Sequence, residues 1–123
     1  MFLEHVNLSV KDVDRSAAFY SDLLGLHTRW KGTFDDGRKA AHVGDDHFYL
    51  ALFEAPAAGS VNHDYLRPGI NHFGFVVDDL DAVRDRLEQL AASDVTDTSD
   101  YEPGRRLYFR DPDDIEVELV SYG

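Results

Sequence analysis

Residues 5–12 of the chain read HVNLSVKD, and residues 72–79 read HFGFVVDD. The two stretches lie 72 − 5 = 67 positions apart, and each begins with histidine and ends with aspartate. The same offset, without a gap, aligns further identical residues: Val10 with Val77, Asp14 with Asp81, Leu23 with Leu90, Asp46 with Asp113, and Leu52 with Leu119. Self-similarity at a fixed offset indicates two related structural modules in one chain.

Each module is predicted to begin with a β-strand. In residues 5–10 apolar side chains alternate with polar ones, and residues 73, 75 and 77 repeat the apolar positions. A period of two places alternate side chains on opposite faces of a strand. His5 and His72 are therefore expected on the face that points away from the core.

A helix is predicted after each first strand. Asp12 and Asp79 suit the N-cap positions of these two helices. The first helix is expected to run through Leu24 and to stop at Gly25. The second carries an apolar stripe at helical spacing, made of Leu80, Val83, Leu87 and Leu90.

Three further strands are predicted in each module. They cover residues 26–34, 38–43 and 47–54 in the first module, and residues 95–99, 105–110 and 114–121 in the second. Residues 35–37, Asp-Asp-Gly, are a hairpin signal. Residues 55–69 contain prolines and glycines and are interpreted as a linker. The sequence thus predicts an α+β fold with two tandem βαβββ modules, residues 1–54 and 70–123, forming one domain over residues 1–123.

Composition narrows the classes of function. The chain has 123 residues, of which 43% are hydrophobic, which is enough for a packed core. It has no cysteine, which excludes disulfides, cysteine–zinc sites and thiol nucleophiles within the chain. The net charge of −12 argues against nucleic acid as a partner and favours a cationic ligand. Adaptation to high salt and the codon usage of a GC-rich genome are both compatible with this acidity.

The cytoplasm is the expected location. Residues 1–5 lack the basic region and the apolar run of an export signal. No stretch approaches the roughly 20 apolar residues that span a bilayer, so no membrane partner is expected.

A candidate metal site follows from the position of the ligands on the strands. His5 and His72 are equivalent in the two modules and share the face away from the core. In the last strand, alternate residues from Ile115 to Leu119 form the apolar face, so Glu118 points to the opposite side. Two histidines and one carboxylate suit one divalent ion of Fe, Mn, Zn, Ni or Co, with coordination positions left open. The alternative for Glu118 is an ordinary solvent-facing carboxylate.

Several segments make the chain resemble the vicinal oxygen chelate superfamily. They are EHVNLSV at residues 4–10, AFY at 18–20, LGL at 24–26, GINHFGF at 69–75, and FRDPD at 109–113 followed by EL at 118–119. This group contains glyoxalase I, extradiol dioxygenases, fosfomycin-resistance transferases, methylmalonyl-CoA epimerase and bleomycin-resistance proteins. The resemblance covers essentially the whole chain. It implies paired βαβββ modules around a metal-binding cleft, with His5, His72 and Glu118 at the ligand positions.

The chain departs from the family pattern at two places. The usual Gly-Asn after Asp-Pro-Asp is Asp114-Ile115 in this chain. The repeat mate of Glu118 is residue 118 − 67 = 51, an alanine, where glyoxalase I and the epimerase carry a fourth ligand. Because Ala51 can neither bind a metal nor move a proton, classical glyoxalase I chemistry is disfavoured. Glu54 lies three residues further on and could take this place only through a β-bulge.

Other residues are candidates for substrate contact. Four residues occupy strand positions that are predicted to face the cleft: Asn7, Tyr49, Phe53 and Glu116. Alternatively, Tyr49 and Phe53 belong to the core.

In residues 105–110, either Leu107 and Phe109 or the alternating set of Arg106, Tyr108 and Arg110 could line the cavity. Tyr108 could donate to an oxyanion and Arg106 could hold an anionic group, or the arginines are solvated. The remaining histidines, His27, His42, His47 and His63, have no repeat mates and are interpreted as surface residues.

The first function hypothesis is a metal-dependent enzyme acting on a small oxygen-bearing substrate. The three-ligand pattern favours a dioxygenase- or transferase/lyase-type reaction, with no catalytic residue assigned. The alternative is a metal-independent drug- or small-molecule-binding protein of the bleomycin-resistance type, which the net charge favours. A third possibility is a family member that kept the ligands without an activity. The resemblance also implies a homodimer, in which His5 of one chain would meet His72 and Glu118 of the other.

Overall fold

The structure is a computed structural model that describes residues 1–55, 59, 61–90 and 92–123. Within these residues the elements follow the order βαβββ twice, as predicted. They are β1 (His5–Val10), α1 (Val13–Leu24), β2 (His27–Thr33), β3 (Lys39–Gly44), β4 (Tyr49–Glu54), β5 (Phe73–Val76), α2 (Leu80–Leu87), β6 (Ser99–Tyr101), β7 (Gly104–Arg110) and β8 (Glu116–Ser121).

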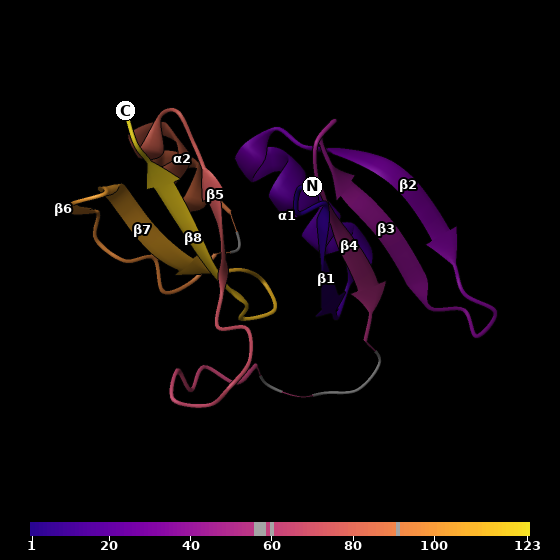
Figure 1. Cartoon of the computed structure of the whole chain (residues 1–123). Helices are drawn as coiled ribbons and strands as arrows, with labels where there is room; N and C mark the ends of the chain where they lie inside the picture. The colour runs from indigo at the N-terminus through magenta and orange to yellow at the C-terminus, as the bar shows by residue number, and fades with distance from the viewer. Residues whose placement is uncertain (56–58, 60, 91) are drawn as a thin grey trace. The chain divides into compact units, whose positions relative to one another are not determined.

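The chain divides into two compact units, Met1–Gly59 and Ser60–Gly123. Each unit has a four-stranded sheet, in the order β1-β4-β3-β2 in the first and β5-β8-β7-β6 in the second. Figure 1 shows one helix against one face of each sheet. The boundary falls inside the predicted linker at 55–69, of which residues 56–58 and 60 lie outside the described residues.

Strand pairing confirms the repeat in this part of the fold. In the first unit β1 pairs with β4 in parallel, with His5 opposite Tyr49, a separation of 49 − 5 = 44 positions. In the second unit β5 pairs with β8 in parallel, with Phe73 opposite Val117, again 117 − 73 = 44 positions. Equivalent residues therefore pair in the same way within each unit, and the pair of Glu118 and Gly74 corresponds to the pair of Ala51 and Asn7.

Both helices begin where their caps predict. The Asp12 carboxylate accepts a hydrogen bond from the backbone N–H of Arg15 at 3.0 Å, and Asp79 caps Ala82 at the same distance. These bonds satisfy N–H groups that have no partner inside the helix. α1 ends at Gly25, whose φ of 69° is the left-handed conformation that favours glycine. α2 ends at Leu87, so the predicted apolar stripe is shorter than expected.

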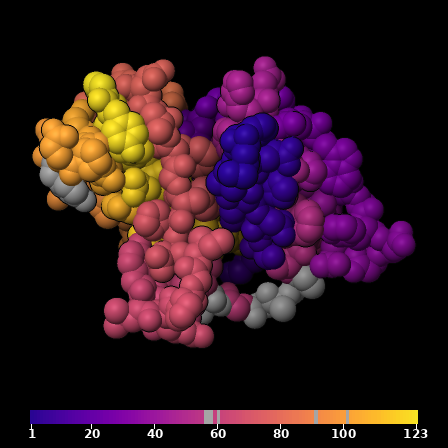
Figure 2. Space-filling view, viewed as in Figure 1, coloured from indigo at the N-terminus to yellow at the C-terminus, as the bar shows by residue number. Residues whose placement is uncertain are grey.

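The core of each unit lies between its helix and its sheet. In the first unit the buried side chains include Leu8, Val10, Val13, Phe19, Tyr20, Leu23, Val43, Leu50 and Leu52; in the second they include Leu80, Val83, Leu87, Leu107, Phe109, Val117 and Leu119. In β1 and β8 the apolar face is thus the buried one, and His5 and Glu118 lie on the opposite face of their strands. Residues 1–3, before β1, are exposed and form part of the indigo surface in Figure 2.

The prediction for residues 95–99 is wrong, because β6 covers Ser99–Tyr101. Thr96 lies beside β7 and accepts the backbone N–H of Tyr108 through its side-chain oxygen at 2.9 Å, while its own N–H donates to the Tyr108 carbonyl at 2.9 Å. A side-chain oxygen thus takes the place of the backbone carbonyl that a regular ladder requires.

The last strand begins two residues later than predicted. Asp114 has a φ of 66° and belongs to the turn that joins β7 to β8. The buried Asp111 carboxylate closes this turn by accepting the backbone N–H groups of Asp113 at 2.8 Å and Ile115 at 3.0 Å. β8 therefore starts at Glu116. Among the helices of the described residues, none is long and apolar enough to cross a membrane.

Candidate functional site

His72 and Glu118 face each other in the second unit. His72 directly precedes β5, and Glu118 lies on the neighbouring strand β8, opposite Gly74. The His72 Nε2 atom is 3.3 Å from Glu118 Oε1, and the two side chains are 27% and 13% exposed. The structure therefore brings together two of the three predicted ligands and gives Glu118 a largely buried position, which overturns the alternative of a solvent-facing carboxylate.

Arg106 binds the other oxygen of Glu118. Its Nη1 atom is 3.4 Å from Glu118 Oε2, and its side chain is only 13% exposed. Arg106 reaches this position because it and Tyr108 lie on the face of β7 opposite the buried Leu107 and Phe109. The set containing Arg106 and Tyr108 is thus the one beside Glu118, and Arg106 is an ion-pair partner rather than a solvated charge.

Two tyrosines hold the His72 ring. Tyr108, the register partner of Glu118, packs against it edge to face, with ring centroids 5.3 Å apart. The Tyr65 hydroxyl lies 3.3 Å from His72 Nδ1 and donates to Glu116 Oε1 at 2.7 Å. The hydrogen bond to Glu116 raises the pKa of Tyr65 to about 12, so the phenol stays protonated at neutral pH.

Tyr65 is a site residue that the sequence did not predict. It lies in the segment interpreted as a linker and has no repeat mate, since 65 − 67 falls before the first residue. Turn hydrogen bonds place it: Asn62 Oδ1 accepts the N–H of Asp64, and Asp64 Oδ1 accepts the N–H of Leu66. The polar turn residues around it signal local structure, but nothing in them indicates His72 as the partner.

His5, in the first unit, is also held through its Nδ1 atom. That nitrogen lies 2.9 Å from Glu4 Oε1, and the hydrogen bond lowers the pKa of the Glu4 carboxyl. The His5 ring stacks on Tyr49, with centroids 4.8 Å apart and 12° between planes. Because a carboxylate only accepts, His5 donates from Nδ1 and its Nε2 atom stays available for another partner.

Tyr49, a predicted contact residue of the first unit, belongs to a row of aromatic rings. Tyr49 stacks on His42 at 4.3 Å, His42 meets Trp30 at 4.9 Å, and the Arg29 guanidinium lies 4.9 Å from the centre of the Tyr49 ring. Tyr49 is half-buried rather than a core residue. Burial, followed by the charges of His5 and Arg29, lowers the pKa of His42.

Phe53 and Asn7 have local partners. Phe53 is half-buried and packs edge to face on Phe34 at 5.4 Å. Asn7 donates its side-chain amide to the Ala51 carbonyl at 2.8 Å. β4 pairs with β1 in unbroken register from Tyr49 to Glu54. No bulge therefore brings Glu54 to the position of Ala51.

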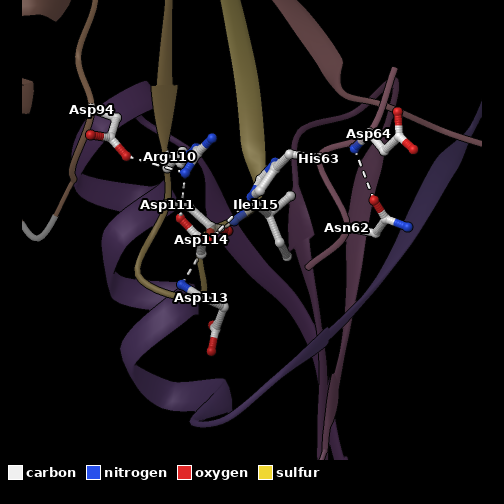
Figure 3. A network of polar contacts seen from close by, with 9 residues as sticks. All are labelled: Asn62, His63, Asp64, Asp94, Arg110, Asp111, Asp113, Asp114 and Ile115. Atoms are coloured by element: carbon white, nitrogen blue, oxygen red, sulfur yellow. Dashed lines mark hydrogen bonds and ion pairs between the residues drawn. The ribbon is translucent and has the colours of Figure 1, made fainter. Parts of the chain in front are cut away.

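The interpretation of the remaining histidines as surface residues is only partly correct. His27 and His47 are exposed, whereas His42 is half-buried among the rings. His63 is 20% exposed and binds Asp114 Oδ2 through Nε2 at 3.1 Å. Figure 3 shows this pair together with Arg110, which lies between Asp114 and Asp94.

His72 and Glu118 have the spacing of two neighbouring metal ligands. Atoms about 2.1 Å from the same first-row ion lie about 3 Å apart when they occupy adjacent coordination positions. Within the described ranges, no group of three or more His, Cys, Asp or Glu side chains gathers as a metal cluster. The second unit thus offers one imidazole and one carboxylate of a candidate centre, and His5 lies in the first unit.

Comparison with known proteins identifies the family. The model of the Glyoxalase/Bleomycin resistance protein/Dioxygenase superfamily matches residues 2–119. The chain is 31% identical to the glutathione transferase FosA of Serratia marcescens, over 95% of this chain and 78% of that protein.

Two solved structures share the fold. A glyoxylase/bleomycin resistance protein/dioxygenase domain from Frankia sp. EAN1pec is 30% identical, with a TM-score of 0.83 over 100% of this chain and 93% of that chain. The fosfomycin resistance protein FosX of Listeria monocytogenes, complexed with Mn(II) and sulfate, is 20% identical, with a TM-score of 0.74 over 98% of this chain and 91% of that chain. With a family model matching nearly its whole length and the tandem βαβββ fold of its relatives, this chain belongs to the glyoxalase/bleomycin resistance protein/dioxygenase superfamily.

Proposed function

We propose that this protein is a metal-dependent enzyme whose His5, His72 and Glu118 hold one divalent cation, to which a small oxygen-bearing substrate binds. The observation that carries the proposal is the approach of His72 Nε2 to Glu118 Oε1 at 3.3 Å. These are the side chains that the repeat and the family resemblance select as ligands.

The surroundings of His72 favour a cation at this point. Tyr65 donates its only hydroxyl hydrogen to Glu116, so its oxygen can accept a hydrogen bond from His72 Nδ1–H. A neutral His72 then points the lone pair of Nε2 at a carboxylate oxygen. Two electron-rich atoms at this distance repel each other, and a metal ion between them would relieve this repulsion.

The chemistry of the site follows from the ligand number. When bound, the ion would act as a Lewis acid on the oxygen atoms of a substrate. Arg106 holds one oxygen of Glu118 and leaves the other towards His72. Ala51 places no base at the equivalent position of the first unit, which favours transferase- or dioxygenase-type chemistry over proton abstraction. The similarity to FosA supports the transferase class, and the Mn(II) of the FosX complex supports a divalent ion.

Metal analysis of the purified protein tests the proposal. We expect about one divalent ion per chain in the wild type, and a loss of at least about tenfold in affinity in each of His5→Ala, His72→Ala and Glu118→Ala. His27→Ala is the matched control, because His27 is an exposed histidine on β2 and lies outside the proposed site. Stoichiometric metal in His72→Ala and Glu118→Ala at wild-type affinity would refute the proposed centre.

The charge of the chain supports one competing function. A net charge of −12 favours capture of a cationic drug without a metal, as in bleomycin-resistance proteins. Titration of chelator-treated protein with bleomycin separates the two. Tight binding that is unaffected by His72→Ala would replace the enzyme proposal with a binding function.

A further inference from the structure

The hydroxyl of Tyr65 connects one acidic side chain, Glu116, to the imidazole of His72. Glu116 accepts its proton at 2.7 Å, and His72 Nδ1 lies 3.3 Å from its oxygen. On the far side of the ring, His72 Nε2 faces Glu118. The polar chain therefore runs from Glu116 through Tyr65 and His72 to Glu118.

The direction of each hydrogen bond in this chain follows from chemistry. A carboxylate has no proton to give, so the Tyr65 O–H points to Glu116. The phenol oxygen then has only lone pairs to offer His72, and Nδ1 must be the protonated nitrogen of the ring. In the neutral ring this arrangement leaves Nε2 without a proton, and Nε2 is the atom directed at Glu118.

We propose that Tyr65, held by Glu116, is a positioning residue that fixes His72 in the Nδ1–H tautomer and so presents Nε2 as the metal-binding atom. The ligand role of His72 rests on the proposed function, but the tautomer stands without it. In the first unit Glu4 binds His5 through Nδ1 in the same sense. Hydrogen-bond partners of this kind, behind metal-binding histidines, commonly contribute about 10–100-fold in metal affinity.

The position of Tyr65 supports a directing role over a packing role. Its side chain is largely exposed, with 52% of the residue accessible, so its ring contributes little to the core. Its ring stacks on the His72 ring with centroids 6.2 Å apart, and its hydrogen bonds with Glu116 and His72 are made by the hydroxyl. Tyr65→Phe therefore removes the directing group while leaving the ring in place.

Nitrogen NMR of the His72 ring in metal-free protein measures the tautomer directly. At a pH of about 8.5, where histidine is normally neutral, we expect the wild type to show Nδ1–H. Tyr65→Phe should lose this preference. Glu116→Ala should reverse it, because the released Tyr65 hydroxyl can now donate to Nδ1 and leave the proton on Nε2. Tyr122→Phe, at an exposed tyrosine of the same unit, should match the wild type.

Metal affinity gives the second readout. We expect Tyr65→Phe and Glu116→Ala each to weaken binding by about 10–100-fold. In the Tyr65→Phe background, Glu116→Ala should have little further effect, because Glu116 acts through Tyr65. Thermal unfolding of all variants verifies that they fold.

The outcomes separate the two proposals. If His72→Ala keeps wild-type metal binding, the metal centre is refuted, and the NMR result still decides the tautomer. If His72→Ala loses the metal while Tyr65→Phe keeps both the wild-type affinity and the Nδ1–H tautomer, the positioning role of Tyr65 is refuted alone.

Discussion

The Arg106–Glu118 pair concentrates opposite charges in a position with little access to water. Each side chain is only 13% exposed, and the nearest atoms lie 3.4 Å apart. A charge in such a position is costly when its partner is removed, because water cannot replace the lost interaction. The carboxylate that the proposed metal needs is therefore paired with a cation from the neighbouring strand β7.

Arg106→Gln should lower the free energy of unfolding by about 2 kcal/mol, the order expected when a mostly buried charge loses its partner. Arg105→Gln is the control, since Arg105 and its partner Asp81 are 41% and 72% exposed and such pairs contribute about 0–1 kcal/mol. Urea unfolding measures both. Adding Glu118→Gln to Arg106→Gln should recover part of the loss, and equal effects at positions 105 and 106 would contradict the assignment.

The turn between β7 and β8 contains one residue, Asp114, in an unusual backbone conformation. Asp114 occupies the left-handed conformation, with a φ of 66°, at the place where the resemblance leads one to expect glycine. Aspartate and asparagine tolerate this conformation better than other side chains do. The Asp114 carboxylate also reaches His63 and Arg110, which a glycine could not bind.

Asp114→Asn should destabilise the protein at neutral pH but not at low pH. The hydrogen bond from His63, with the charge of Arg110, lowers the pKa of the Asp114 carboxyl. A lowered pKa in the folded state gives stability that is present above the ordinary carboxyl pKa of about 4 and is lost as the pH falls through the lowered value.

Because this pair is half exposed, the difference at pH 7 should be less than about 1 kcal/mol. Urea unfolding of both proteins at pH 7 and at about pH 2.5 measures it. Asparagine keeps the turn conformation, so the comparison isolates the charge. A difference that persists or grows at the lower pH would show that the carboxylate charge is not its cause.

The sequence predicted most of the elements because their signals are local. Asp12, Gly25 and Asp79 mark helix ends through their own hydrogen bonds or backbone conformation. The strands followed from alternation, and the repeat fixed their equivalence. The position of β6 was predicted wrongly because Thr96 interrupts the regular pairing with β7. Its side-chain oxygen, in place of a backbone carbonyl, accepts the N–H of Tyr108, which lies 12 positions away in the sequence.

Site residues were predictable only where they have a mate in the repeat or lie on a strand with alternating apolar and polar side chains. Parity put Glu118 opposite the apolar face of β8 and grouped Arg106 with Tyr108 on β7, but it left open which face of β7 lies beside Glu118. In the structure Arg106 and Tyr108 lie there. Tyr65 could not be predicted, because its bond to Glu116 spans 51 positions and starts from an irregular segment. Such contacts depend on tertiary structure, which leaves no periodic signal in the sequence.

At the scale of the whole molecule, the two units carry complementary parts of the proposed centre. The first unit holds His5 with its Nδ1 bound to Glu4, and the second holds His72 and Glu118. The three proposed ligands come either from one chain or from two. We propose the second arrangement, a homodimer with two equivalent shared sites, as the resemblance implies. In a two-fold symmetric dimer each contact between the chains occurs twice, so the dimer would contain two equivalent sites.

Mixing two variants that are each deficient in metal binding tests whether the metal site is shared between two chains. At a metal concentration that fills the wild type but not the weakened variants, His5→Ala and His72→Ala should each bind little metal alone. In a dimer that contains one of each, one site lacks both histidines, while the other takes His5 from the His72→Ala chain and His72 with Glu118 from the His5→Ala chain. After unfolding and refolding an equal mixture, half of the dimers are mixed, and we expect about one ion per four chains. Sedimentation should show dimers throughout. If all three ligands came from one chain, the mixture would recover no metal, and a metal-loaded monomer of the wild type would equally exclude the shared site.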